Sequence, residues 1–346
     1  MMSNKDVHAG RSDHNAMGSS PTRPLQVSWF DRWQPVLDEA LQALPEAESC
    51  PHELYRLLVQ NQDAAHKRTA LVTDRGEPVA VVGLRQIGRC HWEPVTQWLL
   101  PGIVCPARPG YLMPALEALK VDLRVAWWRL AGPPPPSPLM RYSECTPVYR
   151  MPCTADFERY WRKTRYFKTI QHSRHRCEGF TWSVNAPGAA TWVIQNWDSK
   201  WHEHGATADL SLADRLLAAT YLERRGQHYT HVLLDGETPI AGATSLVHGR
   251  DLVAGVIYRH PDYDRFGVGV RIIDLVFAFA AENGFERMDI GGGYDYKQKW
   301  APQEGERWQF DLCPSFLYRA KQLVHWEREA WHKVTDWLHH RSPSLN

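Results

Sequence analysis

Two hydrophobic patterns alternate along the chain, and they occur in a similar order in both halves. Apolar residues spaced three or four apart predict helices, and short apolar runs bounded by Asp, Asn or Gly predict strands. In the first half the predicted helices cover residues 35–43, 53–60 and 111–120, and the predicted strands cover 69–73, 78–84 and 122–130. In the second half the predicted helices cover 155–177, 212–225 and a segment ending at Glu282, and the predicted strands cover 180–184, 191–196, 228–234, 240–247, 251–258 and 287–290. The shared order of hairpin or meander, helix and strand predicts two related α/β lobes.

Proline and polar segments suggest where these lobes begin and end. Four consecutive prolines at 133–136 predict an extended linker. We therefore expect an N-terminal lobe at 25–150 and a C-terminal lobe at 151–316. Residues 1–24 are polar and have no apolar core, which predicts a disordered tail and no signal peptide.

The last segment, 317–346, is predicted to form an amphipathic helix. Leu317, Val324, Trp331 and Leu338 recur at seven-residue intervals, with further Trp and basic residues beside them. Such a stripe usually packs on its own protein, although a basic helix that carries Trp could also make a weak membrane-surface contact or pair with a partner helix.

Composition narrows the class of protein. The 346 residues include 40 Lys and Arg against 39 Asp and Glu, a formal charge of +1, which excludes a protein that coats nucleic acid through general positive charge. The uncharged stretch 94–107 is interrupted by Pro101 and Gly102 and is shorter than the roughly 20 residues that a membrane helix needs. The seven cysteines form no C-x-x-C pair, which favours reduced thiols in a cytoplasmic protein and gives no reason to expect a metal site.

A glycine pair at a helix start is the sharpest local motif. The strand 251–258, which ends at Tyr258, is followed by a loop with Gly267 and Gly269 and then by an amphipathic helix. Free N–H groups in the first helical turn and the positive end of the helix dipole favour an anion such as a pyrophosphate. The alternative is a tight turn without a ligand. Because position 272 is Ile, the motif does not extend to the G-x-G-x-x-G of dinucleotide sites.

The order of the second half closely resembles the GNAT acyltransferases. The resemblance is carried by the three-strand meander, the Gly267-x-Gly269 helix, the turn 284–286, the strand with Asp289 and the sequence Gly-Tyr-Asp-Tyr-Lys at 293–297. It is strong over 154–316 and holds only in outline over 25–149. Within the superfamily the chain looks like the Fem-type, cellulose-biosynthesis-associated branch, which implies an α/β fold of two GNAT-like lobes with mixed, mainly antiparallel central sheets flanked by helices.

The resemblance also implies a cofactor site and catalytic residues. The pyrophosphate of acyl-CoA would lie over the amides of Gly267, Val268, Gly269 and Val270, close to Tyr258 and Arg265. Three residues before the first glycine, where the family has Arg or Gln, this chain has Asp264. An aromatic-Lys pair in the Fem-type enzymes corresponds to Tyr296 and Lys297, and implies that Lys297 stabilises the tetrahedral intermediate while Tyr296 lines the pocket.

Acyl transfer also needs a base, and the sequence leaves its identity open. Asp289, Tyr294 and Asp295 are candidates, and Asp289 could face either the cleft or a buried hydrogen-bond partner. The glycines Gly292 and Gly293 could give substrate room to approach the main chain.

Positive charge is concentrated in one segment. Residues 159–176 include seven Lys or Arg, two His and no acidic residue. This local field would attract an anion, and we expect Arg165, Lys168 and Arg174 to contact a phosphate of donor or acceptor.

These observations predict an enzyme that transfers an acyl group, with acetyl-CoA as the donor and no metal. The acceptor would be an amine or hydroxyl of a sugar, an amino acid or a cell-envelope or polysaccharide precursor. One alternative is a Fem-like transferase that uses charged tRNA, for which the basic segment would contact RNA. Another is a non-catalytic scaffold of a polysaccharide assembly.

Overall fold

The computed structural model describes residues 24–47, 50–61, 66–88, 91–97, 99–100, 105–122, 127–131, 140–153, 156–203, 212–292 and 295–312. The predicted linker at 133–136, the predicted C-terminal helix at 317–346 and nearly all of the predicted tail lie outside these residues.

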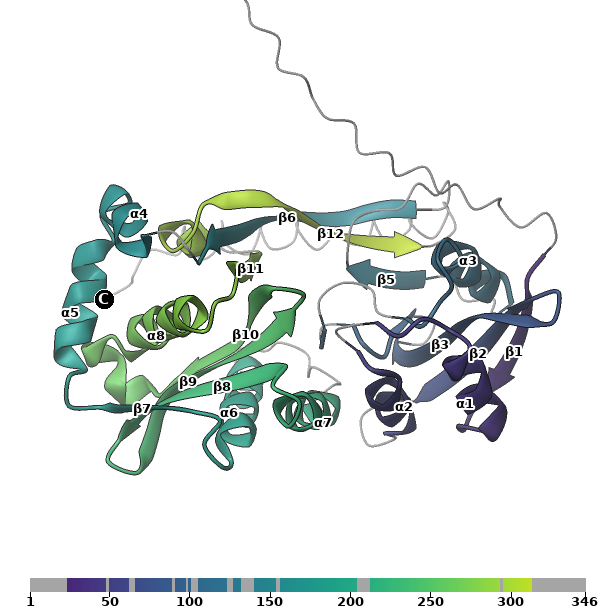
Figure 1. Ribbon diagram of the computed structural model, residues 1–346, viewed down its shortest axis with the longest axis horizontal. Coiled ribbons are helices and arrows are strands. Elements are labelled where there is room, and N and C mark those ends of the chain that lie inside the picture. The colour runs from purple at the N-terminus through teal and green to yellow at the C-terminus, as the bar shows by residue number, and fades with distance from the viewer. Residues whose placement is uncertain are drawn as a thin grey trace, which may run out of the picture.

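Twelve strands form one mixed sheet in the order β1-β2-β3-β4-β5-β12-β6-β11-β10-β9-β8-β7 (Figure 1). The N-terminal half contains β1 Gln26–Phe30, α1 Pro35–Gln42, α2 His52–Gln60, β2 Lys67–Asp74, β3 Glu77–Gly88, β4 His91–Pro94, α3 Leu112–Asp122, β5 Trp127–Ala131 and β6 Met140–Pro152. The C-terminal half contains α4 Phe157–Lys163, α5 Phe167–Arg176, β7 Thr181–Val184, α6 Ala189–Glu203, α7 Leu212–Glu223, β8 His228–Asp235, β9 Thr238–His248, β10 Asp251–Arg259, the 3₁₀ helix η1 Pro261–Phe266, α8 Val268–Glu282, β11 Arg287–Gly292, the 3₁₀ helix η2 Asp295–Lys299 and β12 Gln303–Leu312.

The predicted repeat is confirmed by the sheet topology. The series β1-α1-α2-β2-β3-β4-α3-β5 returns as β7-α6-α7-β8-β9-β10-α8-β11. In each series the strands are antiparallel until the helix, after which β5 pairs parallel with β4 and β11 pairs parallel with β10. The last strand of each half lies between the halves: β12 pairs with β5, β6 pairs with β11, and β6 and β12 pair with each other. This exchange joins the two halves into one sheet, as the long strands above the helices in Figure 1 show.

Helices cover both faces of the sheet in the C-terminal half. Neighbouring residues of β8 point to opposite faces, so Val232 packs with α6 and α7, whereas Leu233 packs with α8. Figure 1 shows α8 on one side of β8, β9 and β10, and α6 on the other. Each face of the sheet therefore contributes separate side chains to any opening that crosses it.

The single helix predicted at 155–177 is two helices. The carbonyl of Trp161 accepts from the hydroxyl of Thr164 at 2.9 Å and from the N–H of Tyr166 at 3.1 Å, so the regular hydrogen-bond pattern of α4 does not continue past this point. Arg165 follows with a φ of 59°, which ends α4 before α5 begins. The basic residues of 159–176 consequently lie on two helices with different directions.

The strand predicted at 191–196 is wrong, because these residues belong to α6. The apolar run there resembles a strand, but Ala189, Val193 and Ile194 are buried at a spacing that places them on one helical face. Gly188, with a φ of 79°, precedes the helix. The strand predicted at 122–130 is also shorter than expected, because Asp122 ends α3 and β5 begins at Trp127.

Candidate active site

An opening forms in the C-terminal half where β10 and β11 separate. The parallel pairing between them covers 251–253 and 287–289. Beyond it, β10 has an irregular register with β9 between Ala254 and Ile257. Gly255 lies in this bulge, and a Cβ there would be 2.3 Å from Oγ1 of Thr244, so only glycine fits. The N–H of Val256 donates to the same oxygen at 3.0 Å, which fixes the bulge.

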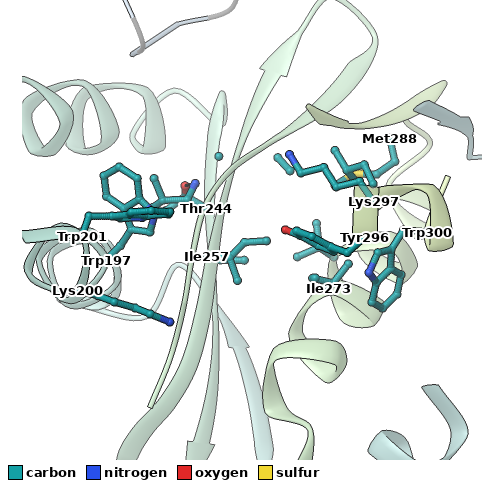
Figure 2. A pocket seen from close by; sticks show the side chains of 16 residues that line it. Trp197, Lys200, Trp201, Thr244, Ile257, Ile273, Met288, Tyr296, Lys297 and Trp300 are labelled. Atoms are coloured by element: carbon teal, nitrogen blue, oxygen red, sulfur yellow. Dashed lines mark hydrogen bonds between the residues drawn. The ribbon is translucent and has the colours of Figure 1, made fainter. Parts of the chain in front are cut away.

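A cavity of about 330 Å³ occupies this opening, at the lower end of volumes typical of small-molecule sites. Its lining residues are Trp197, Lys200, Trp201, Ala243, Thr244, Ala254, Gly255, Val256, Ile257, Ile273, Val276, Met288, Ile290, Tyr296, Lys297 and Trp300. Residues of α6 line one side, and residues of α8 and η2 line the other (Figure 2). Because α6 and α8 cover opposite faces of the sheet, the cavity passes through the sheet between the separated strands.

The predicted pair Tyr296 and Lys297 lies on the wall formed by η2. The ammonium of Lys297 donates to the carbonyl of Gly292 at 2.9 Å, and the Tyr296 side chain is 46% exposed. Trp300, at the end of this segment, is buried against Trp161 with ring centroids 5.6 Å apart. The indole N–H of Trp161 also donates to the carbonyl of Trp300 at 3.0 Å. These contacts hold the Lys297 turn beside the cavity.

The charges around the cavity are one-sided. Of the described residues that line it, Lys200 and Lys297 are basic and none is acidic. Positive charge in a partly apolar cavity stabilises a developing oxyanion, and it disfavours a second ammonium group nearby.

The helix α8 begins as the sequence predicted and lies next to the cavity. Gly267 has a φ of 75°, and its carbonyl accepts from the N–H groups of Val270 and Arg271. The N–H groups of Val268 and Gly269 have no acceptor within the described part of the chain. Ile273, four residues after Gly269, lines the cavity. This is about 6 Å along a helix, so the start of α8 lies about one helical turn from the part of the cavity wall that Ile273 forms.

An unpredicted arginine lies at this helix start. Arg259 pairs with Asp264, and its Cδ lies 2.8 Å from the position that a Cβ on Gly269 would take. The guanidinium of Arg265, which the sequence favoured, is stacked over Phe266 at 4.8 Å. Tyr258 is buried on the α6 face against Trp192, with ring centroids 5.2 Å apart. Asp264, at the position where the family has Arg or Gln, therefore holds a different arginine close to Gly269.

The sequence left open whether Asp289 faces the cleft or a buried hydrogen-bond partner, and the structure shows the second. It is 3% exposed, pairs with Arg150 at 2.8 Å and accepts from the N–H of Gly291 at 2.6 Å. Its neighbours Met288 and Ile290 line the cavity, so the alternation of the strand directs Asp289 to the other face. Asp289 shapes the turn of β11 and does not face the cavity.

The space left by Gly292 is also used by the protein itself. A Cβ on Gly292 would lie 2.8 Å from the carbonyl oxygen of Pro147 on β6, so β6 takes up the room that we expected for substrate. Gly293 and Tyr294 lie outside the described residues, and of Asp295 only the backbone, which begins η2, is described.

The basic segment does not line the cavity. Arg165 and Lys168 are exposed on its outside. Arg174 pairs with Asp274 at 2.6 Å and with Glu158 at 2.7 Å, and the hydrogen bonds that its guanidinium donates to these carboxylates raise its pKa. The absence of acidic residues between 159 and 176 therefore does not leave Arg174 without a partner, because its carboxylates come from α8 and from the residue just before the segment.

The sequence did not single out the α6 wall, formed by Trp197, Lys200 and Trp201. Their spacing of three and four residues places them on one helical face, but the predicted strand at 191–196 hid that signal. The glycine inside the 251–258 strand pattern was a signal for the bulge at Gly255.

The described residues contain no group of three or more His, Cys, Asp or Glu side chains that could hold a metal ion, and no helix among them is long and apolar enough to cross a membrane.

Comparisons with known proteins agree with this geometry. The family described as an acetyltransferase (GNAT) domain matches residues 157–298. A conserved protein of unknown function from Bacteroides thetaiotaomicron aligns with 83% of this chain and 100% of its own at 12% identity and a TM-score of 0.52. L-PGS from Bacillus licheniformis aligns with 84% of this chain and 95% of its own at 11% identity and a TM-score of 0.51.

A tandem GNAT protein from the clavulanic acid biosynthesis pathway aligns with 84% of this chain and 99% of its own, at 11% identity and a TM-score of 0.46. A comparison with curated protein sequences finds no match. At these identities the two structures with TM-scores of 0.52 and 0.51 show a shared fold. Residues 157–298 form an acetyltransferase (GNAT) domain, the type of domain that carries N-acyl transfer.

Proposed function

We propose that the chain transfers an acetyl group from acetyl-CoA to the amine of a small acceptor, and that the two substrates meet inside the cavity. The observation that carries this proposal is the passage through the sheet at the β10–β11 separation, with Lys297 in its wall and the start of α8 about one turn from it. The donor would enter from the α8 side, with its pyrophosphate at Gly267–Val270 and Arg259. The acceptor would enter from the α6 side. This division leaves a separate path for each substrate.

The chemistry is a direct attack of the acceptor nitrogen on the thioester carbonyl. A C–N bond forms, the oxygen becomes an oxyanion, and collapse of the intermediate expels the CoA thiolate, while the nitrogen loses one proton to solvent. The ammonium of Lys297 would stabilise the oxyanion. Burial beside Lys200 and Lys297 would lower the pKa of the acceptor amine. A neutral nucleophile would then form without a carboxylate base in the cavity wall.

Isothermal titration calorimetry of acetyl-CoA tests the donor site. We expect wild-type protein to bind acetyl-CoA and Gly269→Glu to show no binding heat, because the new side chain crowds Arg259 and places a carboxylate where the pyrophosphate would lie. Gly179→Glu is the matched control, since a Cβ there meets nothing within 4 Å. If the wild-type protein gives no binding heat with acetyl-CoA but binds charged tRNA, the donor is charged tRNA, as in the Fem-like alternative, and not acetyl-CoA.

Replacing Lys297 tests the catalytic step. We expect Lys297→Met to lower kcat about 100-fold, the effect of removing one oxyanion donor, with the KM for acetyl-CoA changed only a few-fold. Release of the CoA thiol with a primary amine acceptor measures both constants. Lys299→Met is the control, because Lys299 lies in the same short helix, is exposed and does not line the cavity. Equal kcat values for the wild type and Lys297→Met would show that Lys297 does not stabilise the oxyanion.

A further inference from the structure

Positive charge covers one end of the molecule, where α4 and α5 lie away from the N-terminal half (Figure 1). Lys299 of η2 belongs to the same surface, because its carbonyl accepts from the hydroxyl of Thr164 at 3.3 Å and its ammonium lies 5.6 Å from the ring centroid of Tyr166. This surface, which we call the basic end, consists of the exposed residues Arg159, Lys163, Arg165, Lys168 and Lys299.

The acidic residues closest to the basic end in the sequence have other partners. Glu158 pairs with Arg174 at 2.7 Å and with Arg162 at 3.6 Å. The carboxylate of Asp156 accepts from the backbone N–H of Arg159 at 3.1 Å and so caps α4. Within the part of the chain that the structure describes, no carboxylate forms an ion pair with any of the five cations of the basic end. Their positive charge is therefore available to a partner.

The chain itself has no long segment with the opposite charge. The two longest segments outside the described residues are 1–23, with three basic and two acidic residues, and 313–346, with five basic and three acidic residues. Both have a net positive charge, so neither is complementary to the basic end.

The aromatic side chains of α4 and α5 face the interior, which leaves charge as the main chemistry of the outer face. Phe157, Tyr160, Tyr166 and Phe167 pack against the apolar core of the C-terminal half. The cavity of the candidate active site is lined by none of the five cations. Proteins that select a single-stranded nucleic acid stack its bases on exposed rings or hold the strand in a groove. A charged helix face without exposed rings fits a flat surface of negative lipid headgroups better.

We propose that the basic end docks on the surface of an anionic lipid membrane. The hydroxyl of Tyr160 donates to the carbonyl of Gln298 at 2.8 Å, which holds α4 against η2. Tyr296 of η2 is 46% exposed and lines the cavity, and tyrosine is a residue that membrane–water interfaces favour. Docking through the basic end therefore brings the η2 side of the cavity next to the lipid headgroups.

Vesicle flotation with the full chain, without acetyl-CoA, tests this proposal independently of acyl transfer. Vesicles of phosphatidylcholine alone are compared with vesicles that contain about 30% phosphatidylglycerol, at salt concentrations of about 0.05 M and about 0.5 M. We expect binding to the anionic vesicles to be at least about 10-fold tighter at low salt, and this difference to disappear at high salt, where the negative surface potential is screened. Equal binding to the two kinds of vesicle at low salt would overturn the proposal.

Charge reversal assigns the binding to the basic end. Arg159→Glu/Lys168→Glu is expected to weaken binding to the anionic vesicles at least about 10-fold. The fold tolerates this change because both residues are exposed in the first turn of a helix, where an acidic side chain is favourable. Arg32→Glu/Arg224→Glu is the matched control, since it changes the net charge equally at exposed positions outside the basic end.

Three outcomes of this comparison would contradict the proposal. Vesicle binding that the reversal at 159 and 168 leaves unchanged would place the membrane contact elsewhere, for example in the segment 317–346. An equal loss of binding in the control variant would attribute the effect to net charge alone. Retention of tRNA by the wild type that the reversal abolishes, without vesicle binding, would make the basic end a surface for RNA.

Discussion

Asp214→Asn is expected to lower the free energy of unfolding by about 3–5 kcal/mol, the effect of removing one partner of a buried ion pair. The Asp214 side chain on α7 is fully buried and accepts from the Lys67 ammonium at 2.8 and 2.9 Å and from the Asn61 amide at 2.7 Å. Arg85, also buried, lies 3.8 Å from the same carboxylate and pairs with Glu93. An amide in place of Asp214 leaves two buried cations facing one carboxylate.

Urea unfolding followed by circular dichroism measures this effect. Asp38→Asn is the matched control, because the Asp38–Arg56 pair is exposed and surface pairs contribute about 0–1 kcal/mol. The double variant Asp214→Asn/Lys67→Met is expected to be more stable than Asp214→Asn alone, since it removes the cation that lost its partner. An unchanged urea midpoint for Asp214→Asn would show that water reaches this cluster and replaces the carboxylate.

This cluster joins the two halves of the protein. Asp214 belongs to α7, whereas Lys67 and Arg85 belong to β2 and β3 of the N-terminal half. Beside it, Ala218 and Leu222 of α7 pack in one apolar cluster with Leu54 and Leu58 of α2. Together with the exchanged strands β6 and β12, these contacts of α7 hold the C-terminal half against the N-terminal half. The lobe boundary predicted at 150/151 falls inside β6, which pairs with strands of both halves.

Local patterns predicted the elements around the start of α8 well. The meander, the helix α8 and the strand β11 follow from short apolar runs and from glycines at the turns, because each of these signals acts within a few residues. Lys297 is correctly placed next to the cavity, since the turn that carries it directly follows β11. The resemblance to the GNAT enzymes supplied what spacing alone did not, namely which of many lysines to choose.

Non-local contacts account for what the sequence did not reveal. The pairing of β12 with β5 and the position of Asp274 beside Arg174 both join residues that are far apart in the chain, so no local window contains the partner. The break at Arg165 depends on contacts of Thr164 with both Trp161 and Lys299. The α6 wall of the cavity was missed for the opposite reason: a local apolar run favoured a strand, and tertiary packing selected a helix.

Acid is expected to destabilise the protein through two buried histidines of β8. Burial lowers the pKa of His228 to about 4, and burial together with the nearby His228 lowers the pKa of His231 to about 3. In the unfolded chain both pKa values return to about 6.5. Their stabilising contribution is therefore fully present above pH 6.5 and is lost as the pH falls toward 4 and 3, because the unfolded state takes up protons that the folded state does not bind.

The expected loss between pH 7 and pH 5 is about 2 kcal/mol for each histidine. Urea unfolding of the wild type and of the double variant His228→Gln/His231→Gln at both pH values isolates the contribution of the two histidines to the free energy of unfolding. Carboxylates titrate equally in the two proteins and therefore cancel. The double variant should lose about 4 kcal/mol less than wild type over this interval, whereas exposed His248→Gln should follow wild type. His231 lies 3.2 Å from the Ser245 hydroxyl and faces the Phe279 ring at 4.9 Å, so its ring has no room for a hydration shell when protonated. Identical pH dependence in the wild type and the double variant would mean that both rings become protonated in the folded protein, and that β8 opens to water without unfolding.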